Sequence, residues 1–237
     1  MTDLGENVDL LWEPRGRGAR PQRLALTVDR IADAAIEVAD SEGMSAVSMQ
    51  HVAARLDVTK MALYRHVSSK AELVAVMIES AVGEPPNLMT VPGGWRPRLT
   101  HWAELMRAAW HRHPWLPAAT TGDRPTGPRE VGWTESAVAA LSDTGLTGGE
   151  RMDAVFLLSG HIRNAQSSST AGTQPWTTDK SLLEVLHRHR DRFPALFEAA
   201  MSTDDNAPND NGWTFGLTRI LDGLESLIND RQTPSQH

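Results

Sequence analysis

The stretch Ser48–Lys70, SMQHVAARLDVTKMALYRHVSSK, predicts two short helices joined by a tight turn. We expect the first helix from Ser48 to Leu56 and the second from about Lys60 to Val67, because Ser48 and Thr59 are residue types whose side chains favour helix N-termini. Two helices that meet through so short a turn are typical of the helix-turn-helix unit. In that unit the second helix enters the major groove of DNA.

The predicted second helix carries chemistry suited to DNA on one face. Lys60, Met61, Tyr64 and Arg65 fall at positions i, i+1, i+4 and i+5, which share one side of a helix. Two cations, a phenol and a thioether can meet phosphates, base edges and a thymine methyl group. The alternative is an ordinary solvated helix face. The apolar residues of the pair should pack inward, and they are Val52, Leu56, Val58, Leu63 and Val67.

The segment Leu56–Lys70, LDVTKMALYRHVSSK, resembles the recognition region of TetR-type transcriptional regulators. The specific part is Leu-Tyr-x-His at 63–66, with Lys70 four residues later. Further similarity lies in HPWL, GDRPTGP, LLSGHIRNA and FGLTRILDGLESLI, so that the resemblance covers nearly the whole chain from Pro14 on. It implies an all-α protein with an N-terminal three-helix, helix-turn-helix domain and a larger C-terminal helical domain for ligand binding and dimerisation.

The resemblance also implies which residues contact DNA. Ser48 is expected at phosphate, Gln50 at a base or phosphate, and Lys70 at phosphate. The full predicted set is Ser48, Gln50, Thr59, Lys60, Met61, Tyr64, Arg65, His66 and Lys70. Met61 occupies a position that varies widely in the family and Arg65 adds a charge, so the operator sequence is not predicted.

The implied function is a homodimeric regulator, most simply a repressor, that binds a palindromic operator in double-stranded DNA and is released by a small-molecule effector. Activation in place of repression stays open. The alternative function is a helical small-molecule-binding protein or enzyme that uses this fold without DNA.

Three segments are expected along the chain: a flexible basic N-terminal arm at residues 1–26, the helix-turn-helix domain at 27–72 and the C-terminal domain at 73–237. The arm contains Arg15, Arg17, Arg20 and Arg23, with no acid between Pro14 and Val28. It either aids solubility or follows the DNA backbone and minor groove. The net charge of −7 does not exclude a DNA partner, because the field at a docking surface is local.

Helical periodicity continues through the rest of the chain, and no useful β-alternation interrupts it. Thr27 should cap a helix that ends at Gly43, and Ser69 with Glu72 forms a capping box for the helix after the recognition segment. Later helices are expected at about 95–113, 130–143, 149–168, 181–201 and 212–230, with an interruption near Pro194.

Composition limits the other classes of protein. The chain is 40% hydrophobic, which suits a packed core, but no apolar run approaches the ~18 to 20 residues that span a bilayer. The N-terminus is acidic and does not read as a signal peptide, so a cytoplasmic location without membrane association is expected. The absence of cysteine excludes disulfides and thiolate metal sites.

Two sets of residues in the predicted C-terminal domain are candidates for function. Apolar periodicity on two late helices suggests a dimer interface, with the core of a single subunit as the alternative; the residues are Val155, Ser159, Ile162, Leu217, Ile220, Leu221 and Leu224. The eight tryptophans suggest an apolar effector pocket, again with core packing as the alternative. The predicted lining residues are Trp102, Leu105, Trp110, Trp133, Phe156 and His161.

Metal binding and catalysis have little support. The pairs His111/His113 and His187/His189 are spaced i, i+2, which points the two rings to different faces of a helix. We therefore predict no metal site and no cofactor, although an effector that carries Mg²⁺, as in tetracycline-binding members, stays open. The sequence has no G-x-S-x-G elbow, P-loop or H-E-x-x-H motif, so no enzyme activity is expected.

Overall fold

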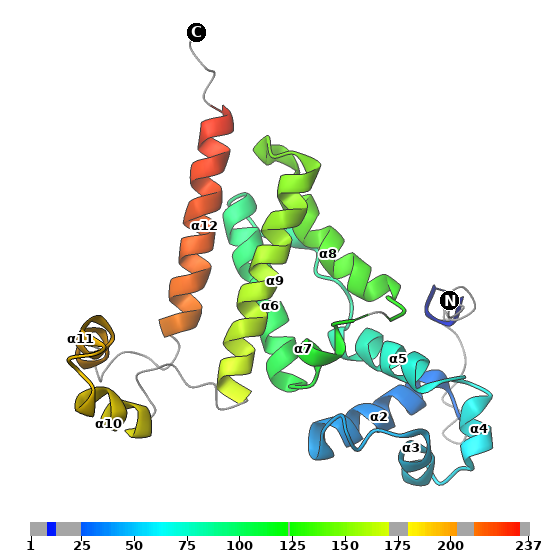
Figure 1. The fold of residues 1–237 in the computed structure, drawn as a ribbon. Coiled ribbons are helices and arrows are strands. Elements are labelled where there is room, and N and C mark those ends of the chain that lie inside the picture. Colours follow the sequence, from blue (N-terminus) through cyan, green and yellow to red (C-terminus); the bar gives the residue numbers. More distant parts are fainter. Residues whose placement is uncertain (1–8, 13–24, 123, 171–179, 203–210, 233–237) are drawn as a thin grey trace. The chain divides into compact units, whose positions relative to one another are not determined.

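The computed structural model describes residues 9–12, 25–122, 124–170, 180–202 and 211–232 (Figure 1). These ranges are helical and contain no strand, which confirms the all-α prediction. The chain divides into two compact units, residues 1–155 and 156–237. The helices of the first unit are α1 (Asp9–Trp12), α2 (Val28–Glu42), α3 (Met49–Arg55), α4 (Lys60–Tyr64), α5 (Lys70–Val82), α6 (Trp95–Arg112), α7 (Leu116–Ala119) and α8 (Pro128–Ala140), with short 3-10 turns at Leu88–Thr90 and Ser142–Thr144.

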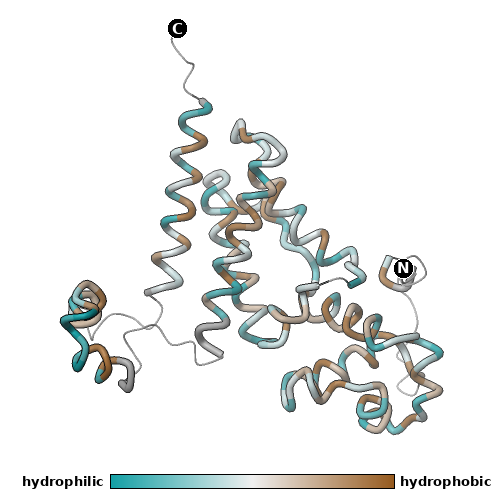
Figure 2. The backbone as a smooth tube through the Cα atoms, viewed as in Figure 1, coloured by the Kyte–Doolittle hydropathy of each residue, from teal (hydrophilic) through white to brown (hydrophobic). Residues whose placement is uncertain are grey.

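Helix α9 (Gly148–Thr170) begins in the first unit and continues into the second, which also contains α10 (Lys180–Arg188), α11 (Pro194–Met201) and α12 (Asn211–Gln232). The predicted interruption near Pro194 is confirmed, because α11 starts at this proline. Proline suits the first turn of a helix, where its missing N–H is not needed. In Figure 2 hydrophobic and hydrophilic residues alternate along α12, as expected for a helix with one buried face.

The predicted caps are confirmed at the start of α2, α3, α4 and α5. Thr27 accepts a hydrogen bond from the Arg30 amide (3.2 Å), and Gly43 ends α2 with a φ of 84°. The predicted inward stripe of α2 is buried, with Ile31, Ala34, Ala35 and Val38 all in the core. α2 packs on α3 and, most extensively, on α5.

Helix α5 joins the helix-turn-helix to the rest of the first unit. Ser69 accepts a hydrogen bond from the Glu72 amide (3.1 Å), while the Glu72 carboxylate accepts from the Ser68 hydroxyl (2.6 Å) and the Ser68 amide. α5 contacts α2 as well as α6, α7 and α8. The predicted domain boundary after residue 72 falls within this helix, so α5 is shared by the two predicted domains.

The N-terminal residues Asp9–Trp12 differ from the mobile segment that we expected. They form the helical turn α1, which packs against α5 with Leu11 only 4% exposed. The Trp12 indole Nε1 donates a hydrogen bond to the carbonyl of Thr126 (3.1 Å). Burial of one leucine and one indole contact hold this turn, and the acidic sequence around it gave no periodicity from which to predict it. The arginines at 15, 17, 20 and 23 lie outside the described residues.

No helix in the described ranges is both long enough and apolar enough to cross a bilayer.

Candidate nucleic-acid interface and body sites

The predicted helix-turn-helix, formed by α3 and α4 and called the reading unit below, has both helix starts fixed by local hydrogen bonds. Ser48 accepts from the His51 amide (3.1 Å) and Thr59 from the Ala62 amide (3.2 Å). The turn between α3 and α4 depends on Asp57, whose φ of 55° lies in the left-handed region. Aspartate is one of the few residues other than glycine that tolerate this conformation. Helix α4 ends at Tyr64, about three residues earlier than predicted from the periodicity.

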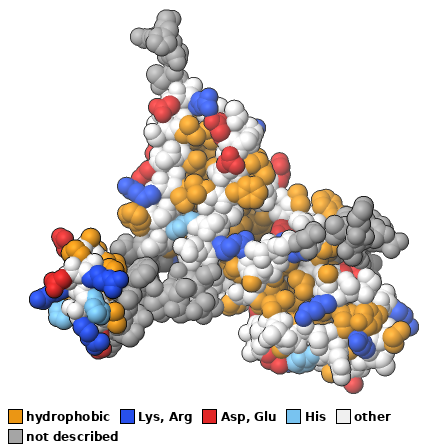
Figure 3. Space-filling view, in the orientation of Figure 1, with side chains coloured by type: hydrophobic (Ala, Val, Ile, Leu, Met, Phe, Trp, Pro, Cys, Tyr) orange, Lys and Arg blue, Asp and Glu red, His pale blue; other side chains and the backbone are white. Residues whose placement is uncertain are grey.

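The predicted DNA-contacting side chains lie on the outside of this unit. Met61 is 72% exposed, and the Lys60 ammonium lies 5.5 Å from the centre of the Tyr64 ring. Eight members of the predicted set are exposed and His66 is half-buried; the eight are Ser48, Gln50, Thr59, Lys60, Met61, Tyr64, Arg65 and Lys70. Figure 3 shows cationic and hydrophobic side chains mixed over the region of α3 and α4.

The cations of this surface differ in their partners. Arg55 is paired with Glu37 of α2 at 3.0 Å. Within the described ranges, no carboxylate forms an ion pair with Lys60, Arg65 or Lys70. These three charges are therefore available to an external anion.

The tryptophans predicted to line the effector pocket are packed in the interior of the first unit. Trp102, Trp110 and Trp133 are buried, and Leu105 is half-buried. The Trp102 indole donates to the carbonyl of Trp133 (2.9 Å), and the Trp133 indole donates to the carbonyl of Gly83 (3.3 Å). Both indole N–H groups are thus satisfied within the protein, as the core alternative predicts.

The other two predicted pocket residues lie in the second unit. Phe156 is 66% exposed and does not line the pocket on α10 and α11. The ring of His161 stacks on Trp213 at a centroid distance of 5.2 Å, and its Nε2 donates to the Trp213 carbonyl (3.0 Å). His161 therefore joins α9 to α12. Gly216 of α12 faces the same ring, and a Cβ at this position would lie 2.2 Å from His161 Cε1.

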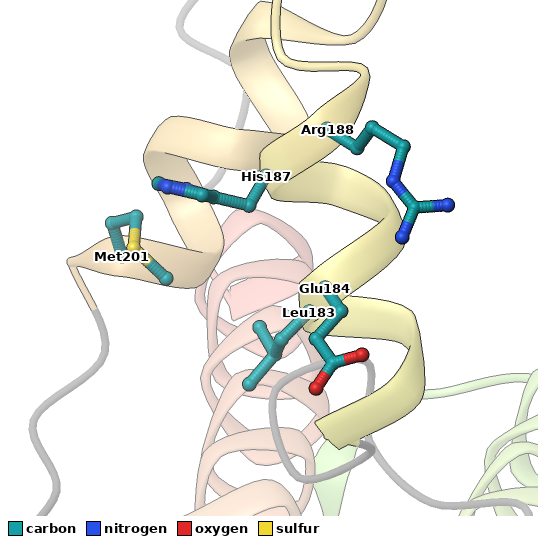
Figure 4. Close-up of a pocket in the computed structure, with 5 residues that line it drawn as sticks. All are labelled: Leu183, Glu184, His187, Arg188 and Met201. Atoms are coloured by element: carbon teal, nitrogen blue, oxygen red, sulfur yellow. The ribbon is translucent and has the colours of Figure 1, made fainter.

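A shallow pocket of about 480 Å³ lies on the pair α10–α11. Figure 4 shows the His187 ring directed toward Met201 and Arg188 directed away from it. The pocket is lined by Leu183, Glu184, His187, Arg188 and Met201, and it includes none of the six predicted effector residues.

Most of the predicted dimer-interface residues are core residues of a single chain. Ser159 and Ile220 are half-buried. The other five are buried, as the single-subunit alternative predicts, and they are Val155, Ile162, Leu217, Leu221 and Leu224. Large apolar side chains on neighbouring faces of the same helices are exposed instead, among them Phe156, Leu157 and Phe215.

Two carboxylates that sequence reasoning missed bind groups far away in the sequence. Glu79 of α5 accepts hydrogen bonds from the Arg129 and Glu130 amides at the start of α8 (2.9 and 3.0 Å). Asp40 of α2 accepts from the His113 Nδ1 (3.0 Å) and from the indole of Trp115 (2.7 Å). Neither motif has a sequence signature, because the partners lie 50 to 75 residues apart.

A third carboxylate, that of Asp33 in α2, has a raised pKa. Burial raises the pKa of Asp33, and repulsion from Asp29 and Glu37 on the same helix raises it further, while a hydrogen bond with Ser80 acts in the opposite direction. The Nδ1 of His113 is hydrogen-bonded to Asp40. Within the described ranges, no group of three or more His, Asp or Glu residues is arranged to hold a metal ion.

Comparison with known proteins gives matches along most of the chain. Residues 26–77 match the family described as "Bacterial regulatory proteins, tetR family", and residues 89–228 match "Tetracyclin repressor-like, C-terminal domain". The chain is 31% identical to the HTH-type transcriptional repressor DrrR1 of Streptomyces coeruleorubidus over 98% of this chain and 90% of that protein. It is 26% identical to the class A tetracycline repressor protein from transposon 1721 of Escherichia coli, over 84% of this chain and 90% of that protein.

Among solved structures, ActR of Streptomyces coelicolor in complex with actinorhodin aligns with a TM-score of 0.72 and 24% identity, over 86% of this chain and 97% of that one. Apo ActR aligns with a TM-score of 0.70 and the same identity, over 86% and 98% of the two chains. At this identity, the likeness to ActR supports the fold alone.

Proposed function

Because the chain belongs to the TetR family of bacterial transcriptional regulators, we propose that it is a repressor that binds a palindromic operator as a homodimer and is released by a small-molecule effector. The proposal of DNA binding rests on the exposed face of α4. It presents Lys60, Tyr64 and Arg65 from a helix whose start is capped and whose inner face is buried, so their positions are set before DNA arrives. An enzyme or ligand carrier that does not bind DNA would leave this cationic face without a role.

We assign the side chains to two kinds of contact. Ser48 at the start of α3 and Lys70 at the start of α5 fit phosphates, since both are exposed at helix N-termini. Arg65 at the end of α4 is our choice for a bidentate contact with guanine. Met61 is the exposed apolar side chain that fits a thymine methyl group.

The proposed dimer explains the exposed apolar side chains of the second unit. Phe156, Leu157 and Phe215 are large and exposed on helices whose other faces form the core. Apolar surface of this kind is typical of an interface between subunits. A two-fold dimer places two reading helices about one turn of DNA apart, ~34 Å, and this spacing selects a palindromic site.

Effector control requires a ligand that binds the DNA-incompetent arrangement more tightly than the competent one. We propose a small, fairly apolar organic molecule that binds in the C-terminal domain. Support comes from the family match over residues 89–228 and from the complexes of ActR with actinorhodin and (S)-DNPA.

The test is DNA binding by the purified protein and by two variants. A duplex selected by the wild-type protein from a random library serves as the probe, at several salt concentrations. Log affinity should fall with log salt by ~0.9 per phosphate contact. Arg65→Ala should cost ~1 to 3 kcal/mol and relax the preference at one base position. Lys70→Ala, the matched control, should weaken binding to all sequences and reduce the salt slope by ~1.

Two results would count against the proposal. If Arg65→Ala weakened binding equally for every sequence, Arg65 would contact only phosphate. If the folded wild-type protein selected no duplex at all, the repressor function itself would be refuted.

A further inference from the structure

The start of α8 has no cap of its own. Its N-cap residue is Gly127, which has no side chain, and its first residue is Pro128, which has no N–H. The first amide donors are therefore those of Arg129 and Glu130. Both donate to the carboxylate of Glu79, one to each oxygen, at 2.9 and 3.0 Å. Glu79 thus supplies from α5 the cap that a serine or aspartate normally supplies locally.

Glycine at position 127 makes this arrangement sterically feasible. A Cβ at Gly127 would lie 2.2 Å from Cδ of Glu79, and the three nearest atoms all belong to that side chain. Glu79 is 3% exposed and each of its carboxylate oxygens accepts a backbone amide, so moving the carboxylate aside would break both hydrogen bonds. The chain therefore brings the backbone of α8 and the side chain of α5 closer than any other residue at 127 would permit.

Further contacts join the same two segments. The Arg129 guanidinium donates to the Glu79 carbonyl (3.2 Å) and to the Glu84 carboxylate (2.7 Å). One turn further along α8, the Trp133 indole donates to the Gly83 carbonyl (3.3 Å). The end of α5, with the two residues that follow it, and the first two turns of α8 are consequently linked by several hydrogen bonds, four of which are partly buried.

Helix α5 is also the support of the DNA-reading unit. Its residues Leu73, Val76 and Met77 are fully buried, and α2 packs along the helix. Separating α5 from α8 would leave a buried carboxylate and two helix-end amides without partners, which is costly. Figure 1 shows α5 between α8 on one side and α2, α3 and α4 on the other.

We propose that Glu79 is a positioning residue that makes the first turn of α8 and the DNA-reading unit respond together. Stabilisation of α5 by DNA at one end holds the Glu79 carboxylate in place at the other, and the cap on α8 becomes harder to open. By thermodynamic reciprocity, a perturbation of the first turn of α8 changes DNA affinity. This inference rests on the proposed DNA-binding function.

The experiment is hydrogen exchange of a peptide covering residues 127–133, with and without the selected duplex. In the wild-type protein, DNA should slow exchange of this peptide. Glu79→Ala should raise the exchange rate in the free protein by roughly ten-fold, the typical effect of a lost cap. It should also abolish the effect of DNA. Glu79→Gln retains one acceptor oxygen and should give intermediate values for both.

A second variant separates capping from coupling. Glu79→Ala combined with Gly127→Ser removes the close contact and gives α8 a local serine cap at a residue whose backbone is already extended, with φ of −94° and ψ of 171°. Slow exchange of the free protein should return, but exchange should no longer respond to DNA.

A DNA effect of wild-type size in this double variant would overturn the proposal, as would a wild-type protein that binds the duplex with no change at 127–133. Absence of DNA binding by the wild-type protein would instead refute the proposed function, so the two failures are distinguishable.

Discussion

Replacement of Gly216 by alanine should destabilise the second unit, because a methyl group there has no space. The added Cβ would lie 2.2, 2.7 and 2.8 Å from three atoms of the His161 ring. The ring cannot easily withdraw, since it is stacked on Trp213 and its Nε2 is hydrogen-bonded to the Trp213 carbonyl. Overpacking of this kind costs typically about 1 to 3 kcal/mol.

The matched control is Gly223→Ala on the same helix. No atom lies within 4 Å of a Cβ at Gly223, so this change gains the helix propensity of alanine, about 1 kcal/mol, without a clash. Gly216→Ala gains the same propensity but adds the clash. The two variants should therefore differ by roughly 2 kcal/mol in the free energy of unfolding, or about 4 to 8 °C in Tm for a chain of this size.

The assay is thermal unfolding of both variants by circular dichroism at one protein concentration. A third variant, Gly216→Ala combined with His161→Ala, removes the ring that obstructs the methyl group. Its destabilisation should be smaller than the sum of the two single changes, because the residues are in direct contact. Equal stability of Gly216→Ala and Gly223→Ala, or additive effects in the double variant, would refute the close packing of α9 on α12.

Two further predictions concern the carboxylates of α2. Asp40→Ala should lower the free energy of unfolding by ~1 to 3 kcal/mol, because it leaves the buried indole N–H of Trp115 without an acceptor. Asp40→Asn retains an acceptor oxygen and should be less destabilised, so equal Tm values for the two variants would contradict this prediction. Because the pKa of Asp33 is raised in the folded protein, its ionisation opposes folding, and this loss of stability develops as the pH rises from the unfolded value of 3.8 through the raised folded value. Asp33→Asn should accordingly have a higher Tm than the wild-type protein at pH 7, and this difference in Tm should vanish as the pH falls below 3.8. A difference in Tm that stays constant across this pH range would argue against the raised pKa.

Much of the reading unit could be predicted from the sequence because local chemistry determines it. Ser48, Thr59 and Ser69 cap the predicted helices through hydrogen bonds to residues three positions away, a range over which spacing is informative. The inward and outward faces of α2 and α4 follow the 3.6-residue period for the same reason. Family resemblance then added the roles of the exposed side chains, which periodicity alone leaves as an ordinary solvated face.

The features that could not be predicted depend on contacts between distant parts of the chain. Asp57 adopts a left-handed conformation that its residue type permits but does not require. Trp102 and His161 are compatible with a pocket or with a core, and only their hydrogen-bond partners show that both join helices. The periodicity of α9 and α12 likewise cannot indicate which apolar face meets the same chain and which meets solvent, because both faces carry large hydrophobic side chains.

The contact between Glu79 and Gly127 has an evolutionary consequence. A side chain at 127 is tolerated only if position 79 becomes smaller, and a smaller residue at 79 leaves α8 uncapped unless position 127 supplies the cap itself. Each single step passes through a less stable protein, whereas the paired exchange restores what was lost. Descendants of this sequence should therefore retain the glutamate and glycine together or replace them together, and the two positions should covary across the 48 residues that separate them.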